Sequence, residues 1–447
     1  MRKICVLGLG YIGLPTAAMF ATHGFEVLGV DINEHVLETL NNGDVHIHEP
    51  GLKTVVQAAL KSGKLTVTRS PAPADVFIIA VPTPLKREAE SSSGEDLLPR
   101  ADLSYVSAAA DSIVGCLRGG NLVVLESTVP PGTTKGTLVP ILARSGLSIA
   151  GERMADSGGG EECNREELGM VFVAYCPERV LPGRILGELV QDDRVVGGVD
   201  VASAEMARAL YSSFVEGAIF LTDATTAETV KLMENTYRDV NIALANEFAL
   251  VAEHVGIDVW RAIELANRHP RVDILRPGPG VGGHCIAVDP WFLVQAAPGV
   301  THLINAARHV NDSMLGHVVQ MVKSAAAGMA SPVVACLGLA YKADVDDIRN
   351  SPAIEVVRLL LSEGFEVRPY DPHVAAQTVT GQVDTLDAAV KGADVVLLLT
   401  DHGEFRRWSE ACSMSPSAAI TLDTRGCLGG AALRLGDGTR GATKLAG

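Results

Sequence analysis

Three glycines near the start of the chain have the spacing of a phosphate-binding turn. Gly8, Gly10 and Gly13 form the pattern GxGxxG directly after an apolar run, and Asp31 ends the next apolar run. The first glycine allows a tight turn, the second lets a pyrophosphate approach the backbone, and the third lets helix and strand pack closely. An acid at Asp31 accepts hydrogen bonds from ribose hydroxyls and repels a 2′-phosphate. The pattern predicts NAD rather than NADP as cofactor, the alternative being a glycine-rich turn that binds nothing.

Cys285 is a candidate nucleophile. It lies in the segment GVGGHCIAVDP, where glycines expose the backbone and His284 and Asp289 flank the thiol. A structural cysteine normally lies in an apolar periodic segment, whereas a flexible loop leaves the sulfur accessible. This segment alone leaves a structural cysteine as an equal alternative. Cys5 and Cys336, inside predicted strands, are expected in the core, and the other five cysteines carry no comparable signal.

Lys231 and Asn235 lie four residues apart in a predicted helix, and Glu228 and Arg238 share their stripe. Such a stripe is usually solvated surface. This helix is otherwise apolar enough to be internal, so the polar side chains would need partners, which a substrate pocket would supply.

Two further segments place polar residues after predicted strands. ESTVPPGTT contains Ser127 and Thr128, and CPERVLPG contains Glu178 and Arg179. Ligands of open α/β sheets bind at the carboxyl ends of the strands. Each segment taken alone could equally be a simple turn.

The elements that would position these residues alternate between strand and helix. Residues 3 to 31 predict strand, helix and strand, and apolar runs at 76–81 and 122–125 extend the pattern to a parallel sheet covered on both faces. A helix is predicted from about residue 222 to 256. Its part over 240–255 is expected to be buried on all sides, with another subunit as one candidate partner, and a further helix is predicted over 306–329. Strand and helix alternation restarts at 333. The polar segments 86–102 and 151–169 are predicted as surface loops.

Composition limits the possible functions. The chain has 447 residues, which corresponds to about three domains. A net charge of -16 argues against nucleic acid or an anionic membrane surface as a partner. Eight cysteines without a C-x-x-C pair fit a reducing cytoplasm, and no apolar run is long enough to predict a membrane span.

Seven ordered motifs together resemble the UDP-sugar 6-dehydrogenases of the UDP-glucose/GDP-mannose dehydrogenase family. They are GLGYIGLP, VPTP, ESTVPPGTT, PERVLPG, VKLMENTYRDVNIALANE, GPGVGGHCIAVDPWFL and GLAYKADVDDIRNSP. The resemblance implies an α/β fold with two Rossmann-like parallel-sheet domains joined by a long central helix and a helical dimerisation region. The expected divisions are an NAD-binding domain over 1–205, a dimerisation and catalytic-cysteine region over 206–325, and a UDP-sugar-binding domain over 326–447. A homodimer or higher homo-oligomer is expected, with the helix interface including Ala245, Phe248 and Leu250.

The resemblance also implies roles for individual residues. Cys285 matches the catalytic thiol, Lys231 and Asn235 the pair that stabilises oxyanions, and Asp289 the acid four residues after the thiol. Thr128 and Glu178 match the water-positioning and base groups. A second glutamate frequent in glucose-specific members is replaced by Pro182. Arg271 matches an arginine that reaches UDP from the neighbouring subunit, although its spacing to Cys285 is two residues shorter than in those members. The implied cofactor contacts are Gly8, Gly10, Tyr11, Ile12, Gly13, Asp31, Pro82, Thr83, Glu126, Ser127 and Arg349, and the implied substrate contacts are Arg179, Arg238, Arg271, Gly282, His284 and Lys342, with no metal.

The implied reaction is a four-electron oxidation at C6 of a UDP-sugar, through a thiohemiacetal and a thioester on the cysteine. The segments NTYRDVNIALANE, GVGGHCIAVDPWFL and AARHVNDS are most similar to members that oxidise UDP-N-acetyl-D-mannosamine. UDP-N-acetylglucosamine and UDP-glucose are the alternative substrates. A two-electron β-hydroxyacid-type dehydrogenase and a noncatalytic NAD- or UDP-binding regulator are the competing functions.

Overall fold

The protein is described from a computed structural model, in which the chain divides into two compact units. Unit 1 consists of residues 1–233 and 291–297, and unit 2 of residues 234–290 and 298–447. Most of the two predicted surface loops, at 86–102 and 151–169, lies outside the described residues. Those described are 2–47, 49–86, 98–151, 169–181, 183–375, 377–412, 419–430 and 433–439.

Unit 1 is built on a mostly parallel sheet with the strand order of a dinucleotide-binding fold. Among the described residues the order is β11-β10-β9-β7-β4-β1-β2-β3, so the chain reverses direction of growth between β1 and β4. Only β9 and β10 pair antiparallel within this order. The strands are β1 (Lys3–Leu7), β2 (Glu26–Val30), β3 (Leu65–Thr68), β4 (Val76–Ile79), β7 (Leu122–Leu125), β9 (Met170–Tyr175), β10 (Arg194–Gly198) and β11 (Ile219–Asp223); β5 (Leu85–Lys86), β6 (Arg100–Ala101) and β8 (Ser148–Ile149) are short additions.

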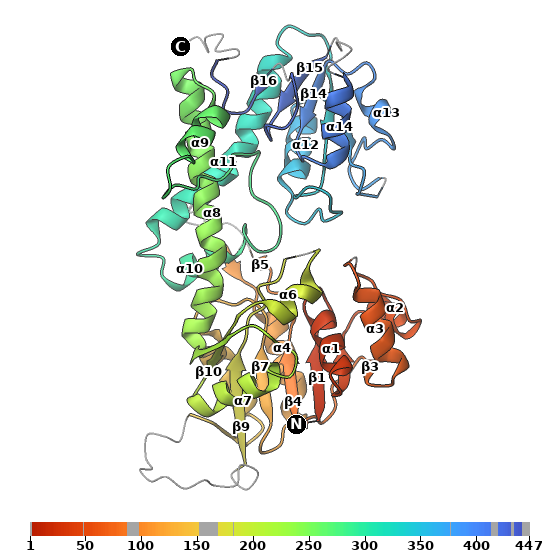
Figure 1. Cartoon of the computed structure of the whole chain (residues 1–447), viewed down its shortest axis with the longest axis vertical. Coiled ribbons are helices and arrows are strands. Elements are labelled where there is room, and N and C mark those ends of the chain that lie inside the picture. Colours follow the sequence, from red (N-terminus) through yellow and green to blue (C-terminus); the bar gives the residue numbers. More distant parts are fainter. Residues whose placement is uncertain are drawn as a thin grey trace, which may run out of the picture. The chain divides into compact units, whose positions relative to one another are not determined.

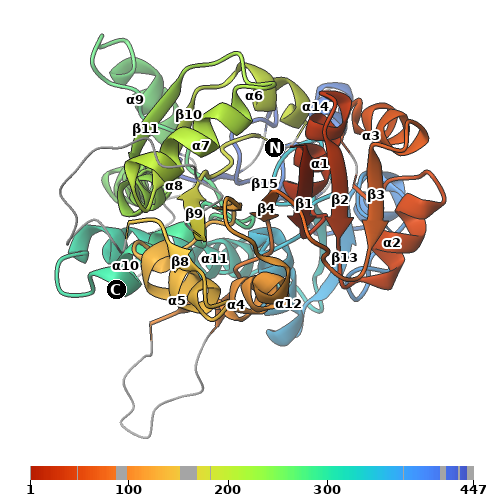
Figure 2. The same ribbon diagram turned by 90° about the horizontal axis from the view of Figure 1, so that it is seen from below.

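Helices cover both faces of this sheet because the strands are apolar on both faces. In β1, Ile4 and Val6 face one hydrophobic cluster while Cys5 and Leu7 face the other. Figure 2 shows α4 and α5 on one side of the strands and α6 and α7 on the other. The helices of unit 1 are α1 (Gly13–Thr22), α2 (Glu34–Asn41), α3 (Leu52–Lys61), α4 (Ser104–Ile113), α5 (Val139–Ala143), α6 (Ile185–Gln191) and α7 (Val201–Tyr211).

The predicted long helix is α8 (Ala224–Val255), of 32 residues, the long vertical helix of Figure 1. Within a single chain this helix is not buried on all sides, and burial against another subunit stays a prediction. Leu244, Val251 and Val255 are 44, 52 and 58% exposed, whereas Ala245 is fully buried. The helix therefore has one covered face and one exposed apolar face.

Unit 2 contains a second parallel sheet, of order β13-β12-β14-β15-β16. Its first strand also alternates, with Val334 and Cys336 on one cluster and Ala335 and Leu337 on the other. Cys5 and Cys336 are both fully buried, as predicted. The remaining elements are α9 (Val259–Ala266), α10 (Asp289–Ala296), α11 (His302–Ala325), β12 (Val333–Leu337), α12 (Pro352–Ser362), β13 (Glu366–Tyr370), α13 (Leu386–Val390), β14 (Val395–Leu398), α14 (Gly403–Cys412), β15 (Ile420–Asp423) and β16 (Leu433–Arg434).

Candidate functional site

The glycine turn of unit 1 has three different steric environments. Gly8 has a φ of +91°, and a Cβ on it would lie 2.5 Å from the Ala80 carbonyl oxygen. A Cβ on Gly13 would lie 1.8 Å from the Gly8 carbonyl oxygen, because α1 starts directly against the turn. Gly10 is exposed, and a Cβ there would meet no atom within 4 Å. Two of the glycines are therefore needed for packing, while Gly10 borders open space.

The surroundings of this turn fit a dinucleotide. No side chain caps the N-terminus of α1 and no acid lies in its first turn, so the N–H dipoles there are not neutralised by the described part of the helix. Tyr11 and Ile12, which precede α1, are half-buried. Asp31 lies half-buried after β2, where one carboxylate oxygen accepts from the Leu9 N–H at 2.9 Å. These residues would hold the pyrophosphate and a ribose.

The VPTP and ESTVPPGTT segments are joined by hydrogen bonds. The Thr83 hydroxyl donates to the Thr128 carbonyl at 2.6 Å, and the Ser127 hydroxyl donates to the Val81 carbonyl at 2.7 Å. Pro82 is exposed beside them. The two segments therefore form one edge at the carboxyl ends of β4 and β7.

Glu228 fixes the far end of the second segment. Its carboxylate, fully buried, accepts from the Thr134 N–H and hydroxyl at 2.7 and 2.6 Å and from the Gly132 N–H at 2.5 Å. The sequence placed Glu228 on the polar stripe of the helix but gave no sign of this structural partner. Burial raises the pKa of Glu228, and the hydrogen bonds from Thr134 and Gly132 oppose that shift.

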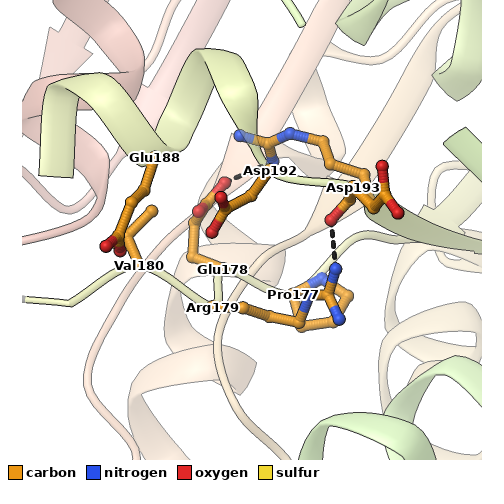
Figure 3. Close-up of a pocket in the computed structure, with 8 residues that line it drawn as sticks. Pro177, Glu178, Arg179, Val180, Glu188, Asp192 and Asp193 are labelled. Atoms are coloured by element: carbon orange, nitrogen blue, oxygen red, sulfur yellow. Dashed lines mark hydrogen bonds and ion pairs between the residues drawn. The ribbon is translucent and has the colours of Figure 1, made fainter. Parts of the chain in front are cut away.

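Glu178 is buried against a cation that the sequence analysis did not single out. Its carboxylate forms an ion pair with Arg194, the first residue of β10, and both side chains are 5% exposed. This ion pair is one of the two dashed contacts in Figure 3; the other joins the half-buried Arg179 to the Asp193 carbonyl. Glu126, also assigned from the sequence, is 3% exposed and accepts from the Tyr211 hydroxyl at 2.6 Å.

The buried stripe of α8 contains Lys231 and Asn235 but not Arg238. Lys231 is 7% exposed, and its ammonium has no hydrogen-bond or ion-pair partner among the described residues. Asn235 is 8% exposed and donates to the Asp289 carboxylate at 2.6 Å. The buried part of the stripe continues through the fully buried Asp239, whereas Arg238, two turns beyond Lys231, is exposed.

The Cys285 thiol is exposed, on the turn that leads into α10. The Cys285 carbonyl accepts from the Val288 and Asp289 N–H groups at 3.0 and 2.8 Å. Since Asp289 also holds Asn235, one buried carboxylate residue connects the cysteine turn to α8.

The glycines before the cysteine are needed because another segment of unit 2 packs on them. A Cβ on Gly282 would lie 2.6 Å from Cδ of Pro352 and 2.7 Å from the Asn350 carbonyl oxygen. The Gly283 N–H donates to the Arg349 carbonyl at 3.1 Å. The segment that leads from β12 into α12 thus packs directly against the cysteine loop and limits the space around its glycines.

Several cations in unit 2 could attract an anionic ligand. Arg349 makes a two-point ion pair with Asp347, at 2.8 and 2.6 Å. Partial burial and this guanidinium lower the pKa of His284, which favours its neutral form. Lys342 is half-buried and Arg271 is exposed.

Arg425 is a cation that the sequence analysis missed. It follows β15, at the carboxyl edge of the second sheet, and its Nε donates to the Leu399 carbonyl at 2.8 Å. Burial lowers the pKa of Arg425, although the nearby carboxylates oppose the shift. The signal available in the sequence was an arginine two residues beyond the end of a predicted strand.

Comparison with known proteins identifies the family. Three family models match in order: the UDP-glucose/GDP-mannose dehydrogenase NAD binding domain at 2–215, its central domain at 225–313 and its UDP binding domain at 335–430. The chain belongs to this dehydrogenase family. It is therefore an NAD-dependent nucleotide-sugar dehydrogenase, an oxidoreductase, and the predictions of family, cofactor and α/β fold are confirmed.

Individual relatives of this family cover nearly the whole chain. A protein of Methanocaldococcus jannaschii named UDP-N-acetyl-D-mannosamine dehydrogenase is 48% identical over 96% of this chain and 93% of its own length. A Ralstonia nicotianae protein named NDP-N-acetyl-D-galactosaminuronic acid dehydrogenase is 47% identical over 95% of this chain and 96% of its own. A solved UDP-D-ManNAc dehydrogenase of Pyrococcus horikoshii has a TM-score of 0.85 and 43% identity, over 98% of this chain and all of that one. In the part of the chain that the structure describes, no helix is long and apolar enough to cross a membrane.

Proposed function

We propose that this dehydrogenase oxidises UDP-N-acetyl-D-mannosamine at C6 to UDP-N-acetyl-D-mannosaminuronate, consuming two NAD+. The observation that carries the choice of sugar is the similarity, over more than nine-tenths of the chain, to two proteins whose names state this substrate. The exposed Cys285 supports the four-electron reaction, since a two-electron alcohol dehydrogenase needs no thiol.

A galactosamine-type sugar is the second candidate. The Ralstonia nicotianae relative is almost as similar over the same length, and its name states an N-acetyl-D-galactosaminuronic acid. Both sugars carry a 2-acetamido group, whereas UDP-glucose carries a hydroxyl. UDP-N-acetylglucosamine stays the alternative that differs only in configuration at C2.

Cys285 and Lys231 carry the oxidation steps in this proposal. NAD+, when bound, supplies the hydride acceptor for each of the two oxidations. The Lys231 ammonium, buried and without a partner among the described residues, would stabilise negative charge on the C6 oxygen. The Cys285 sulfur attacks the aldehyde carbon to form a thiohemiacetal, and the second loss of hydride leaves a thioester.

We assign hydrolysis of the thioester to Glu178 and Thr128. The Glu178 carboxylate accepts a proton from water as the water oxygen attacks the thioester carbon, and the sulfur leaves. Thr128 would orient the water. Asn235, held by Asp289, would donate to the oxyanion that forms.

The negatively charged UDP moiety needs local cations in a protein of net charge -16. We assign this role to Lys342, Arg271 and Arg425, of which Arg425 lies at the carboxyl edge of the second sheet, where open α/β sheets bind ligands. Arg179, Arg238, Gly282 and His284 remain predicted substrate contacts, and Arg349 a predicted cofactor contact. The division into 1–205, 206–325 and 326–447 and the cytoplasmic location also stay predictions.

An NADH assay with a panel of sugars tests the proposal. UDP-N-acetylmannosamine, the UDP-sugars of N-acetylgalactosamine and N-acetylglucosamine, and UDP-glucose would be compared by kcat/KM, with expected preference for the first and two NADH per sugar. Cys285→Ser should lower acid formation by about 10³-fold or more. Cys116→Ser, at a half-buried cysteine without an assigned role, is the control. A yield of one NADH, or unchanged acid formation by Cys285→Ser, would refute the proposed reaction.

We further propose that the exposed apolar face of α8 is a homodimer interface. Tyr237, Leu244, Phe248, Val251 and Val255 are between 36 and 71% exposed and recur at helical spacing along one side of α8. A face of this kind is normally covered by a partner.

Changing Val251 tests this interface. Val251→Asp should shift sedimentation toward a monomer, whereas Val201→Asp, at a 78% exposed valine on α7, should not. A wild-type protein that sediments as a stable folded monomer would contradict this assignment. Of the residues first predicted for the interface, the buried Ala245 is excluded from this face, while Phe248 lies on it.

A further inference from the structure

Unit 1 buries one cation among two carboxyl groups. Arg194, Glu126 and Glu178 are 5, 3 and 7% exposed. An ion in such surroundings loses most of its hydration, so a single guanidinium can balance one carboxylate but leaves the second without a counter-charge. The arrangement therefore raises the question of which glutamate is ionised.

The Arg194 guanidinium is held from several sides. One nitrogen pairs with Glu178, and another donates to the Leu189 carbonyl at 3.3 Å. Its central carbon lies 4.8 Å from the centre of the Tyr211 ring and 5.5 Å from that of Phe214. A planar guanidinium stacked in this way has a fixed orientation, which fixes the carboxylate paired with it.

Glu126 has different neighbours. Its two carboxyl oxygens meet the Tyr211 hydroxyl at 2.6 Å and the Thr16 hydroxyl at 3.5 Å. Hydroxyls can donate to or accept from a protonated carboxyl group, so they tolerate a neutral Glu126. Burial, and then the charge of Glu178, raise the pKa of Glu126 to about 8.

We propose that Arg194 is a positioning residue that keeps Glu178 ionised and oriented, while Glu126 holds a proton at neutral pH. The groups facing this cluster are Thr16 from α1, Tyr211 from α7, Arg194 from β10, and Cys176 and Glu178 from the segment after β9. Burial raises the pKa of the Cys176 thiol to about 12, so it adds no charge. This inference rests on the proposed function, because it gives Glu178 the state that the hydrolysis step requires.

An ionised Glu178 beside a protonated Glu126 has a direct consequence for thioester hydrolysis. In hydrolysis the water oxygen bonds to the thioester carbon, the carbon–sulfur bond breaks with its electron pair going to sulfur, and the water proton goes to Glu178. A Glu178 that already holds a proton cannot accept another. Removing the Arg194 charge should therefore stop the reaction at the thioester on Cys285.

The test compares Arg194→Gln, which removes the charge, with Arg194→Lys, which keeps it. Arg194→Gln should lower kcat by about 10²-fold or more, with little change in KM, and should move the acidic limb of the pH profile to higher pH. Mass spectrometry should find the sugar acyl group accumulated on Cys285. Arg194→Lys should recover about tenfold or more of the loss. Arg144→Gln, at an exposed ion pair of the same unit, is the matched control and should behave as wild type.

A second measurement does not depend on activity. Carboxyl-carbon NMR of isotope-labelled glutamate, with the Glu126 signal assigned by its loss in Glu126→Gln, should show Glu126 titrating near pH 8. An ionised Glu126 at neutral pH would overturn the proposal, as would a wild-type pH profile in Arg194→Gln. Failure of the wild type to oxidise any UDP-sugar would instead refute the proposed function, and the NMR result would still decide the charge assignment.

Discussion

Gly8 and Gly338 occupy the same place in their two sheets. The Gly8 N–H donates to the Val30 carbonyl at 2.8 Å, and the Gly338 N–H donates to the Tyr370 carbonyl at the same distance. Their φ angles are +91° and +94°, in the left-handed region that favours glycine. The backbone frame of the first strand, its turn and the second strand is therefore repeated in the two units.

The acidic residues that follow β2 and β13, Asp31 and Asp371, differ in burial and in hydrogen-bond partners. Asp31 accepts from the Leu9 N–H and stays half-buried. Asp371 accepts from the Leu339 N–H at 2.6 Å but is 4% exposed, and His402 contacts the same oxygen at 3.0 Å. The His402 Nδ1 accepts from a backbone N–H, so Nε2 carries the proton toward Asp371.

The segments after the two turns also differ. In unit 1, α1 begins at Gly13 against the turn; in unit 2, α12 begins only at Pro352, and the residues between clamp Gly282 and Gly283. The same frame is thus followed by a half-buried acid and a helix start in one unit and by a segment that packs on the cysteine loop in the other. The two units therefore share the turn itself and differ in the side chains and segments that follow it.

The largest expected effect is that of Asp371→Asn on folding stability. The carboxylate accepts from the N–H groups of Leu339, Ala340, His373 and Val374 besides His402, and an amide would direct its own N–H groups at some of these donors. The free energy of unfolding should fall by about 3–5 kcal/mol, measured by urea denaturation.

The matched change in unit 1 is Asp31→Asn. Because Asp31 has fewer donors and more exposure, its cost in unfolding free energy should be about 1 kcal/mol. Equal losses for the two variants would show that Asp31 and Asp371 contribute equally to folding stability, contrary to this expectation.

Gly13→Ala should be next in size. Its methyl group would lie 1.8 Å from a backbone oxygen, which only a shift of α1 can relieve, so unfolding should become easier by about 1–3 kcal/mol. Gly10→Ala, with no atom within 4 Å, is the control and should change stability by less than about 0.5 kcal/mol.

The two Gly variants also separate packing from binding. If Gly10 borders the pyrophosphate, Gly10→Ala should weaken NAD binding about tenfold or more in calorimetry while the protein stays stable. Unchanged NAD affinity would remove Gly10 from the cofactor site.

The smallest expected effect is a difference in pH dependence. Burial opposes ionisation of Asp371, but the hydrogen bonds from His402 and two backbone N–H groups lower its pKa overall. Its contribution to stability is therefore present above pH 3.8 and is lost as pH falls through the lower folded value. The pKa of Glu126 is raised to about 8, so its contribution is present below pH 4.5 and is lost as pH rises to about 8.

Unfolding curves at several pH values measure both contributions. Glu126→Gln should remove part of the decline in stability between pH 4.5 and about 8, and Asp371→Asn should flatten the acidic limb. A decline that is as steep in Glu126→Gln as in wild type would show that Glu126 is ionised in the folded protein.

Local spacing predicted the parts of the fold that local rules govern. The pattern of Gly8 to Gly13 with Asp31 indicated the first turn and its cofactor because all of its requirements lie within one βαβ unit. Burial of Cys5 and Cys336 followed in the same way from apolar strands.

Contacts between distant residues could not be predicted from spacing. The Glu178–Arg194 pair and the His402–Asp371 contact join residues on separate elements, and the long sequence separation leaves no periodic signal. The elements that cover each face of α8 could not be predicted for a related reason. An alanine such as Ala245 gives the same sequence pattern whether a neighbouring helix or a partner subunit covers it. Only the packing of the folded chain shows which element covers it.

The most direct test of the difference between the two turns is NAD titration by calorimetry of wild type, Asp31→Asn and Asp371→Asn. A lost hydrogen bond between ribose and carboxylate should weaken NAD binding to Asp31→Asn by about 10- to 100-fold. Asp371→Asn, assayed at a temperature where it is folded, should bind NAD with wild-type affinity. Wild-type affinity in Asp31→Asn, or an equal loss in Asp371→Asn, would contradict the assignment of the first turn alone to NAD.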